Sequence, residues 1–162
     1  MISDAVKQAY LCAKERGWDK IYIAVDIHNT IADSNYKNTM PDILDEAKDA
    51  ISKINKFFPE IVLILWSSCY EKDYEKYMTY FHNNGMSFAY FNENPEVKNS
   101  ETGDFSIKFY FNVLVEDKAG FVKSDWKYLL ESISKYRCLL IQKDTIFDMA
   151  KGLFNTIKQK VT

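Results

Sequence analysis

Three apolar runs in this chain each end in a residue that can do chemistry. The runs and the residues that follow them are 21–25 with Asp26, 61–66 with Ser67, and 111–115 with Glu116 and Asp117. An uninterrupted apolar run such as 61–66 is typical of a strand that is buried on both faces of a parallel sheet. Because parallel strands end at the same edge of their sheet, we expect these polar residues to lie together.

Between the apolar runs, hydrophobic residues recur every three or four positions, which is the spacing of one helical face. We expect helices over residues 3–16, 41–58, 74–81, 124–135 and 146–161, and strands over 20–26, 61–66, 87–91, 110–116 and 138–141. The polar stretch 92–106 is predicted to be a long loop. This alternation predicts one α/β domain over residues 1–162, with a doubly wound, mainly parallel, Rossmann-like sheet and helices on both faces.

The charge balance argues against a polyanionic partner. The formal net charge is −2, with lysines and acidic residues interspersed, so we expect no nucleic acid and no membrane partner. Arginine occurs only at positions 16 and 137. A site that clamps several phosphates usually uses more guanidinium groups, so a small or singly phosphorylated ligand is favoured.

The cysteines and the hydropathy pattern bear on cellular location. Cys12, Cys69 and Cys138 are odd in number and form no Cys-x-x-Cys pair, which is typical of reduced thiols in an intracellular protein. The chain starts with a charged helical pattern, and no apolar stretch approaches the ~20 residues that cross a bilayer. We therefore expect a soluble cytoplasmic protein. The aromatic content of 15% leaves a homo-oligomer open.

Asp26 is the strongest candidate for chemistry, because it ends a buried strand and opens a loop. A carboxylate there can attack phosphorus and form an aspartyl phosphate, which divides one difficult displacement into two easier steps. The alternative is a loop cap, since Asp often accepts hydrogen bonds from backbone amides in turns. Ser67, Lys108 and the pair Glu116-Asp117 follow in the order that a magnesium-assisted phosphoryl transfer needs.

Four short motifs resemble those of the haloacid dehalogenase (HAD)-like phosphohydrolase superfamily. They are Asp26-Ile27-His28-Asn29-Thr30-Ile31, Ser67 after its apolar run, Lys108, and Val115-Glu116-Asp117-Lys118-Ala119. The resemblance spans residues 20–122. It implies a HAD-like hydrolase of the capless type, because the intervals between the motifs leave no room for a large cap domain.

The resemblance also implies a role for each matching residue. Asp26 would be the nucleophile and a ligand of Mg²⁺, and Asp117 would hold the same ion, with Glu116 as a further candidate. Ser67 would hydrogen-bond a phosphoryl oxygen. Lys108 would neutralise charge on the transferring group.

Two of these positions have competitors nearby in the sequence. Lys98, in the polar loop, competes with Lys108 for the role of site lysine, although Lys108 fits better because it comes just before a core strand. Ser68 would replace Ser67 if the end of the strand were shifted by one residue. Thr30 is expected to brace the loop after the nucleophile.

His28 departs from the pattern of this superfamily. Its phosphatases usually carry a second aspartate two residues after the nucleophile, which protonates the leaving group and then activates water. An imidazole can make the same proton transfers near neutral pH. A metal contact through the backbone carbonyl of His28 would not depend on the side chain. A cationic ring beside Mg²⁺ is unfavourable, so we expect a neutral ring or a side chain that turns away.

Three functions remain open at this level. The first is a Mg²⁺-dependent phosphomonoester hydrolase that acts on a small phosphorylated substrate. The second is a phosphate-binding or interaction protein on the same fold, in which His28 marks the loss of turnover. A receiver-like signalling domain is disfavoured, because its acceptor aspartate lies on a middle strand and its acidic pair lies near the first strand.

Overall fold

A computed structural model describes residues 2–34, 40–101 and 103–140, in which helices and strands alternate along the chain. The helices are α1 (Ile2–Arg16), α2 (Asp45–Phe57), α3 (Tyr74–Asn83) and α4 (Asp125–Tyr136), and the strands are β1 (Ile21–Asp26), β2 (Ile61–Trp66), β3 (Tyr90–Phe91) and β4 (Val113–Val115). Three 3₁₀ turns are η1 (Glu71–Asp73), η2 (Asp117–Ala119) and η3 (Arg137–Leu139). None of the described helices is both long enough and apolar enough to cross a membrane.

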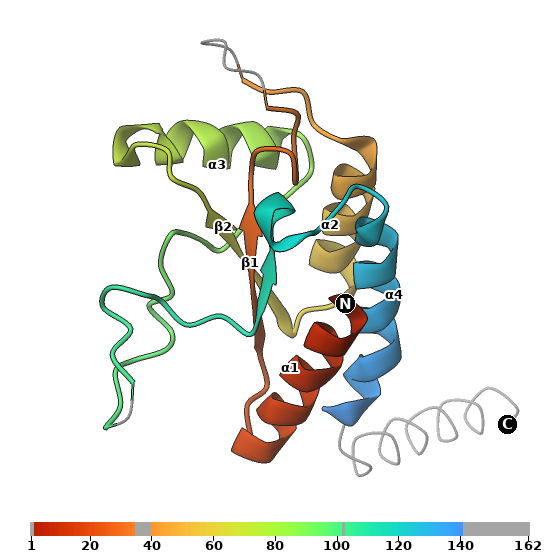
Figure 1. Cartoon of the computed structure of the whole chain (residues 1–162), viewed down its shortest axis with the longest axis vertical. Helices are drawn as coiled ribbons and strands as arrows, with labels where there is room; N and C mark the ends of the chain where they lie inside the picture. Colours follow the sequence, from red (N-terminus) through yellow and green to blue (C-terminus); the bar gives the residue numbers. More distant parts are fainter. Residues whose placement is uncertain (1, 35–39, 102, 141–162) are drawn as a thin grey trace, which may run out of the picture.

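The strands form one parallel sheet in the order β3-β2-β1-β4 (Figure 1). The predicted parallel α/β fold without a large cap domain is therefore confirmed. The chain moves from β1 through β2 to β3 on one side and then returns to β4 on the other side of β1. Such a reversal opens a crevice at the carboxyl ends of the two neighbouring strands between which the chain changes direction, here β1 and the edge strand β4. Asp26 ends β1, and Glu116 follows β4, so both lie at this switch point.

The two faces of the sheet are covered by different kinds of structure. On one face, strand residues such as Ile23 and Leu63 form the main core with side chains from all four described helices. On the other face, Ala24 and Ile64 pack with Phe109 and with half-buried neighbouring rings. Figure 1 places α1, α2 and α4 on one side of the strands and the connection from β3 to β4 on the other. This connection therefore crosses the second face of the sheet, as a doubly wound fold requires. Its described residues, 92–101 and 103–112, form an irregular aromatic segment and not a helix.

The prediction of a last strand over 138–141 is wrong for its described part. The chain continues from α4 into the 3₁₀ turn η3, and Ile141 lies outside the described residues. Arg137 holds this turn, because its guanidinium donates a hydrogen bond to Glu60 Oε2 at 3.2 Å. Leu139 packs against the main core from the turn. A short apolar run can bury its side chains from a helical turn as well as from a strand, so the pattern alone did not distinguish the two.

Two further strands are shorter than predicted. β3 covers only the end of the predicted 87–91, and β4 covers only the middle of the predicted 110–116. The backbone N–H of Asn112 still donates to Tyr22 O at 2.8 Å, so the pairing with β1 begins just before β4. The predicted helix over 146–161 lies outside the described residues.

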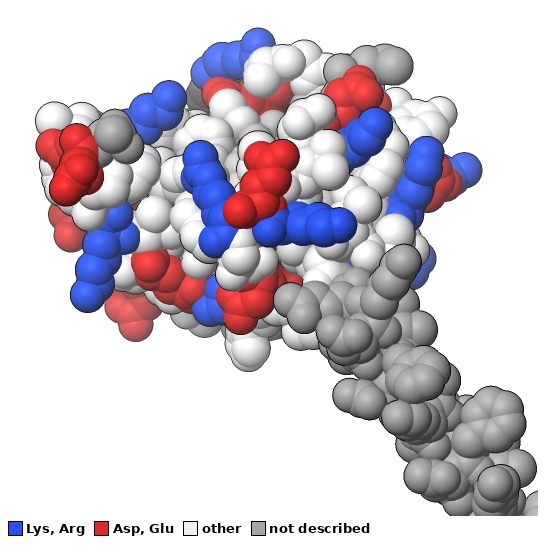
Figure 2. All heavy atoms as spheres, turned by 90° about the horizontal axis from the view of Figure 1, so that it is seen from below, with Lys and Arg blue, Asp and Glu red and all other residues white. Residues whose placement is uncertain are grey.

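Opposite charges lie side by side on the face that contains the amino ends of the strands. Figure 2 shows this face from below, with Lys and Arg side chains next to Asp and Glu. Two of the ion pairs are Lys20 with Glu96 at 2.6 Å and Arg137 with Glu60 at 3.2 Å. The surface in this view thus has the interspersed charges that the sequence predicted.

Glu96 holds the irregular aromatic segment against the sheet by hydrogen bonds. Its carboxylate accepts hydrogen bonds from Lys20 Nζ at 2.6 Å, from the Tyr90 hydroxyl at 2.9 Å and from the Tyr22 hydroxyl at 3.0 Å. The hydrogen bond from Lys20 is the main cause that holds the pKa of Glu96 below its ordinary value. The two phenols lower it further against the opposing effect of burial.

Replacing Glu96 by Gln is expected to lower the free energy of unfolding at neutral pH by about 1–2 kcal/mol, a figure reduced for the partial exposure of the carboxylate. Because the pKa in the folded state lies below the ordinary value of 4.5, this stabilisation is present above pH 4.5. It is lost as the pH falls through the folded-state pKa. Urea denaturation of both proteins between about pH 3 and pH 8 measures the effect. A difference in stability that does not change with pH would contradict it.

Candidate functional site

Asp26 and Asp117 meet at the carboxyl edge of the sheet, where β1 and β4 end next to each other. The Thr30 hydroxyl donates a hydrogen bond to Asp26 Oδ2 at 3.3 Å and accepts one from the backbone N–H of Asp117 at 3.1 Å. Thr30 is almost fully buried, and Trp126 Nε1 donates to its carbonyl at 2.9 Å. One buried threonine thus ties the loop after β1 to the turn after β4 and holds the two acidic residues close together.

The Asp26 carboxylate lies in a negative, half-buried environment. Burial raises the pKa of Asp26 above its ordinary value, and the nearby Asp117 and Glu116 carboxylates raise it further. A hydrogen bond from the backbone N–H of Ile27 and the charge of His28 act in the opposite direction. A carboxylate under these conditions favours either a proton or a bound cation.

Asn29 shapes the loop after Asp26. It adopts a left-handed backbone with φ of 60°, and its N–H donates to Ala32 O at 2.7 Å. Its side-chain Nδ2 donates to Asp117 Oδ2 at 3.1 Å, while the other carboxylate oxygen accepts the N–H of Lys118 at 2.7 Å. No sequence pattern predicted a role for Asn29. The available signal was that Asn adopts the left-handed region more readily than other residues with a side chain, apart from Asp.

Ser67 lies at the same edge and is held by a residue that the sequence analysis missed. It follows Trp66, which pairs with Asp26 across β1 and β2. Asn92, directly after β3, accepts a hydrogen bond from the Ser67 N–H at 2.9 Å and donates one to the Ser67 carbonyl. In the sequence Asn92 is only the first residue of a polar loop, so nothing local marked it.

The imidazole of His28 packs toward α3. Its ring meets the ring of Tyr77 edge-on, with centroids 6.2 Å apart. Within the described residues the imidazole forms no hydrogen bond, although its charge still acts on Asp26. The ring therefore lies near the nucleophile candidate while one of its edges is engaged by an aromatic neighbour.

The two candidate lysines, Lys108 and Lys98, are both exposed, and neither forms a hydrogen bond or an ion pair within the part of the chain that the structure describes. The position of Lys108 is better defined by its neighbour Phe109, whose ring packs on Trp66 at a centroid distance of 5.5 Å. Since Trp66 pairs with Asp26, Lys108 is adjacent to a residue anchored at the site edge. Lys98 is linked less directly to this edge, because its neighbour Val97 packs against the same cluster but Glu96 is bonded to Lys20 at the amino end of β1.

The acidic residues at this edge suit a hard cation. Mg²⁺ is usually bound by one or two protein carboxylates and completes its shell with water and substrate phosphate. Asp26 and Asp117 provide two such carboxylates, and Glu116 lies close enough for its charge to act on Asp26. Among the described residues, no group of three or more His, Cys, Asp and Glu side chains is arranged to hold a metal ion. Asp26 and Asp117, with Glu116 nearby, are the residues at this edge that could hold such an ion.

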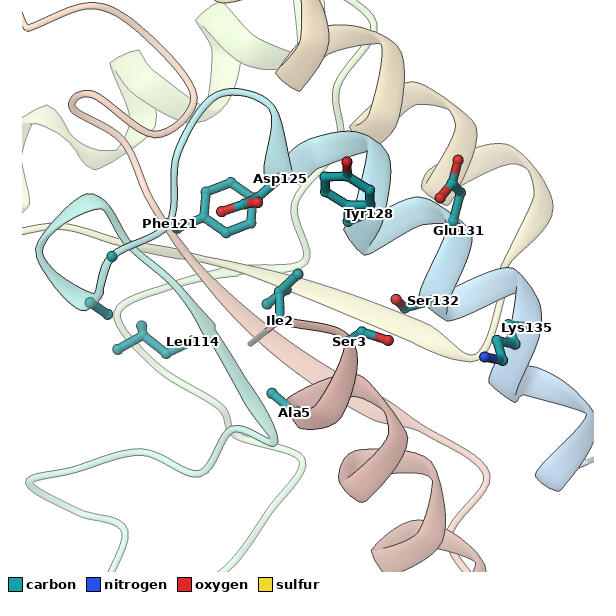
Figure 3. Close-up of a pocket in the computed structure, with 12 residues that line it drawn as sticks. Ile2, Ser3, Ala5, Leu114, Phe121, Asp125, Tyr128, Glu131, Ser132 and Lys135 are labelled. Atoms are coloured by element: carbon teal, nitrogen blue, oxygen red, sulfur yellow. The ribbon is translucent and has the colours of Figure 1, made fainter.

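A cavity of about 830 Å³ opens in another part of the molecule, between the start of α1, the length of α4 and the turn after β4 (Figure 3). Its lining includes Ile2, Leu114, Phe121 and Tyr128. Asp26 does not line it. The predicted site is therefore separate from this cavity.

Comparison with known proteins supports the fold and goes no further. No protein-family model and no curated protein matches the chain. Among solved structures, the chain is similar to a conserved protein coded by a locus from Bacteroides thetaiotaomicron, with a TM-score of 0.57 and 22% sequence identity. The match covers 73% of this chain and 93% of that one. At this level of identity the likeness concerns the α/β fold alone.

Proposed function

We propose that this protein is a Mg²⁺-dependent phosphomonoester hydrolase that forms an aspartyl phosphate on Asp26. One observation carries the proposal: the Thr30 hydroxyl bonds both the Asp26 carboxylate and the Asp117 backbone at the switch point of the sheet. A reactive carboxylate beside a second acidic residue, at the ends of adjacent parallel strands, is suited to phosphoryl transfer. The order of the HAD-like motifs in the sequence supports the same chemistry.

In the proposed reaction, a carboxylate oxygen of Asp26 attacks the phosphorus of the substrate. The new O–P bond forms as the bond to the leaving oxygen breaks, and the leaving oxygen takes a proton from His28 or from water. Water then attacks the phosphorus of the aspartyl phosphate and passes a proton to His28. Inorganic phosphate leaves, and the Asp26 carboxylate is restored.

The remaining residues of the site are proposed to position the reacting groups and to offset their negative charge. Thr30 is proposed to help orient the Asp26 carboxylate through its hydrogen bond. The Ser67 hydroxyl is proposed to donate to a phosphoryl oxygen, and Lys108 is proposed to offset the negative charge of the transferring group. When bound by Asp26 and Asp117, with Glu116 as a further ligand, Mg²⁺ would neutralise charge on these carboxylates and on the phosphoryl oxygens.

Side-chain alternation supports Lys108 as the site lysine. Successive side chains of a strand point to opposite faces, so Asp26 shares the face of Ala24. Phe109 packs on that same face, in a cluster with Ala24. The ammonium of Lys108 is therefore proposed to reach the carboxyl edge along the face on which Asp26 lies.

The proposal is tested by the hydrolysis of para-nitrophenyl phosphate by the purified protein. We expect turnover in the presence of Mg²⁺, loss of most of it after treatment with EDTA, and recovery when Mg²⁺ is added back. An absence of metal-dependent turnover across a broad panel of phosphate esters would contradict the proposal.

A phosphate-binding protein without turnover is the second candidate. The packing of the His28 ring against Tyr77 favours it, because a ring engaged by α3 is less free to reach a leaving group. Binding of inorganic phosphate in the absence of any ester hydrolysis would distinguish this candidate from the hydrolase.

Replacing His28 by Asp tests the role of this position directly. We expect equal or higher kcat for aryl phosphate hydrolysis, because a carboxyl group can both protonate the leaving oxygen and activate water. The measurement is kcat and KM in saturating Mg²⁺, with His82→Asp as the control for an exposed histidine on α3. Complete loss of activity in the His28 variant alone would mean that the imidazole has a specific role of its own.

A further inference from the structure

Asn92 has an unusual backbone at the carboxyl edge of the sheet. It follows the last residue of β3, and its φ of 53° lies in the left-handed region. Its N–H donates to Leu65 O at 2.8 Å, which continues the ladder between β2 and β3. A residue with a side chain adopts this conformation at a cost, and strained residues of this kind cluster at functional sites.

The side chain of Asn92 extends the same ladder by one more residue. Its Oδ1 accepts the Ser67 N–H at 2.9 Å, and its Nδ2 donates to the Ser67 carbonyl. The side-chain amide of Asn92 thus makes the two hydrogen bonds to Ser67 that a backbone peptide group of a neighbouring strand would otherwise make. Nδ2 also donates to the Tyr74 hydroxyl at 2.7 Å, and the Tyr74 ring is stacked on Phe91. Asn92 therefore joins the end of β3, the loop after β2 and the start of α3.

These bonds hold the backbone of Ser67, while its hydroxyl has a separate contact. The Ser67 Oγ accepts the N–H of Cys69 at 3.3 Å, so its own proton remains available to a ligand. Ser67 is only 8% exposed, which restricts the other rotamers of its side chain. Because one amide holds both backbone polar groups of Ser67, Asn92 fixes the backbone from which the serine hydroxyl projects.

We infer that Asn92 is the positioning residue for Ser67, and that it aims the serine hydroxyl at a phosphoryl oxygen. The inference rests on the proposed function for its turnover readout, but it applies equally to phosphate binding without turnover. It adds a residue outside the four motifs on which the proposed function depends. Such a positioning residue acts mainly on the transition state. There the Ser67 hydroxyl must donate to a phosphoryl oxygen that has moved from its position in the bound substrate.

The chain provides a matched control for this inference. Asn55, on α2, makes the same pair of bonds to another serine: its Oδ1 accepts the Ser87 N–H at 2.8 Å and its Nδ2 donates to the Ser87 carbonyl at 2.9 Å. Asn55 lies near the end of α2, and Ser87 precedes β3, so both are at the opposite edge of the sheet. Asn55→Ala removes an equivalent pair of hydrogen bonds without touching the proposed site.

The experiment compares Asn92→Ala, Asn92→Gly and Asn55→Ala by steady-state hydrolysis of para-nitrophenyl phosphate and by inhibition with orthovanadate, which mimics five-coordinate phosphorus. We expect both Asn92 variants to lower kcat by about 10- to 100-fold with little change in KM, as for a misplaced catalytic group. The inhibition constant of orthovanadate is expected to rise by a similar factor. Asn55→Ala should leave all three quantities near the values of the original chain.

Asn92→Gly separates positioning from folding, because Gly adopts a φ of 53° without strain and lacks only the amide. A double-mutant cycle with Ser67→Ala gives a second criterion. If Asn92 acts through Ser67, the Asn92 substitutions should have no further effect on kcat in the Ser67→Ala protein.

Equal effects of the Asn92 and Asn55 variants, or fully additive effects with Ser67→Ala, would overturn the inference. If the unaltered protein shows no turnover, the hydrolase proposal fails. The double-mutant cycle of Asn92 and Ser67 is then measured with the dissociation constant of orthovanadate in place of kcat. A selective loss of vanadate affinity in the Asn92 variants would then still support the positioning role. Vanadate affinity that does not respond to Asn92, or undetectable vanadate binding by the unaltered protein, would overturn it.

Discussion

Replacing Asp26 by Asn is expected to lower Mg²⁺-dependent hydrolysis of para-nitrophenyl phosphate by at least about 1,000-fold. An amide oxygen is a far weaker nucleophile than a carboxylate, and the covalent step cannot proceed without it. The substitution preserves the shape of the side chain, and the amide oxygen can still accept the Thr30 hydroxyl, which donates at 3.3 Å in the original chain. The loss should therefore appear in kcat and not as misfolding.

The stability of the Asp26→Asn protein provides an internal check on this result. Burial and the neighbouring Asp117 and Glu116 raise the pKa of Asp26 in the folded state, so the ionised carboxylate opposes folding at neutral pH. Removing the charge should leave the melting temperature, measured in EDTA, unchanged or higher. A loss of activity together with retained or increased stability is typical of a functional residue.

The control for this prediction is Asp33→Asn, which makes the same substitution at an exposed aspartate in the loop after β1. It should retain activity within about twofold, as expected for a surface change away from reacting groups. Activity of the Asp26→Asn protein comparable to that of the Asp33→Asn protein would exclude Asp26 as the nucleophile.

Replacing Trp126 by Ala is expected to lower the free energy of unfolding by about 3–5 kcal/mol, the usual range for a large buried aromatic residue. Trp126 is fully buried, and its ring meets Phe121 edge-on at 5.2 Å between centroids. Urea denaturation followed by circular dichroism measures the effect without relying on tryptophan fluorescence. A loss below about 1 kcal/mol would contradict the prediction.

Trp126→Phe separates the packing of this ring from its hydrogen bond. Phe keeps most of the apolar volume but loses the indole N–H, which donates to the Thr30 carbonyl at 2.9 Å in the original chain. We expect a loss of about 1–3 kcal/mol, because a buried carbonyl is left without its donor. Trp18→Phe, at a half-buried ring before β1, is the matched control and should cost less. Equal stability of Trp126→Phe and the original chain would show that the bond to Thr30 contributes nothing.

The elements with the longest and most regular patterns were predicted closely from the sequence. β2 has the predicted limits 61–66, and α1, α3 and α4 agree within one or two residues, whereas α2 begins at Asp45 and not at the predicted residue 41. An apolar run that is buried on both faces, or an apolar stripe over three helical turns, repeats one signal many times. The short runs carried too little signal, so the described part of 138–141, residues 138–140, was wrongly predicted to be a strand, and β3 and β4 were predicted too long.

The residues of the candidate site also fall into two groups, those that a local sequence pattern predicted and those that only the structure revealed. Asp26, Ser67, Glu116 and Asp117 were predicted to lie together because each ends or closely follows a strand, and parallel strands bring such ends to one edge. The roles of the asparagines depend on contacts between residues distant in the chain. Asn92 contacts Ser67 from 25 residues away.

By itself, the sequence determined that this chain forms a parallel α/β sheet with acidic and hydroxyl groups at its carboxyl edge, since alternating patterns and strand ends are local properties. Only the tertiary structure decided that Thr30 joins Asp26 to Asp117, that Asn92 holds Ser67, and that an irregular aromatic segment covers the second face. These features depend on side-chain hydrogen bonds and ring packing between segments that meet only after the sheet has formed. No periodic pattern along the chain predicts these contacts between distant segments.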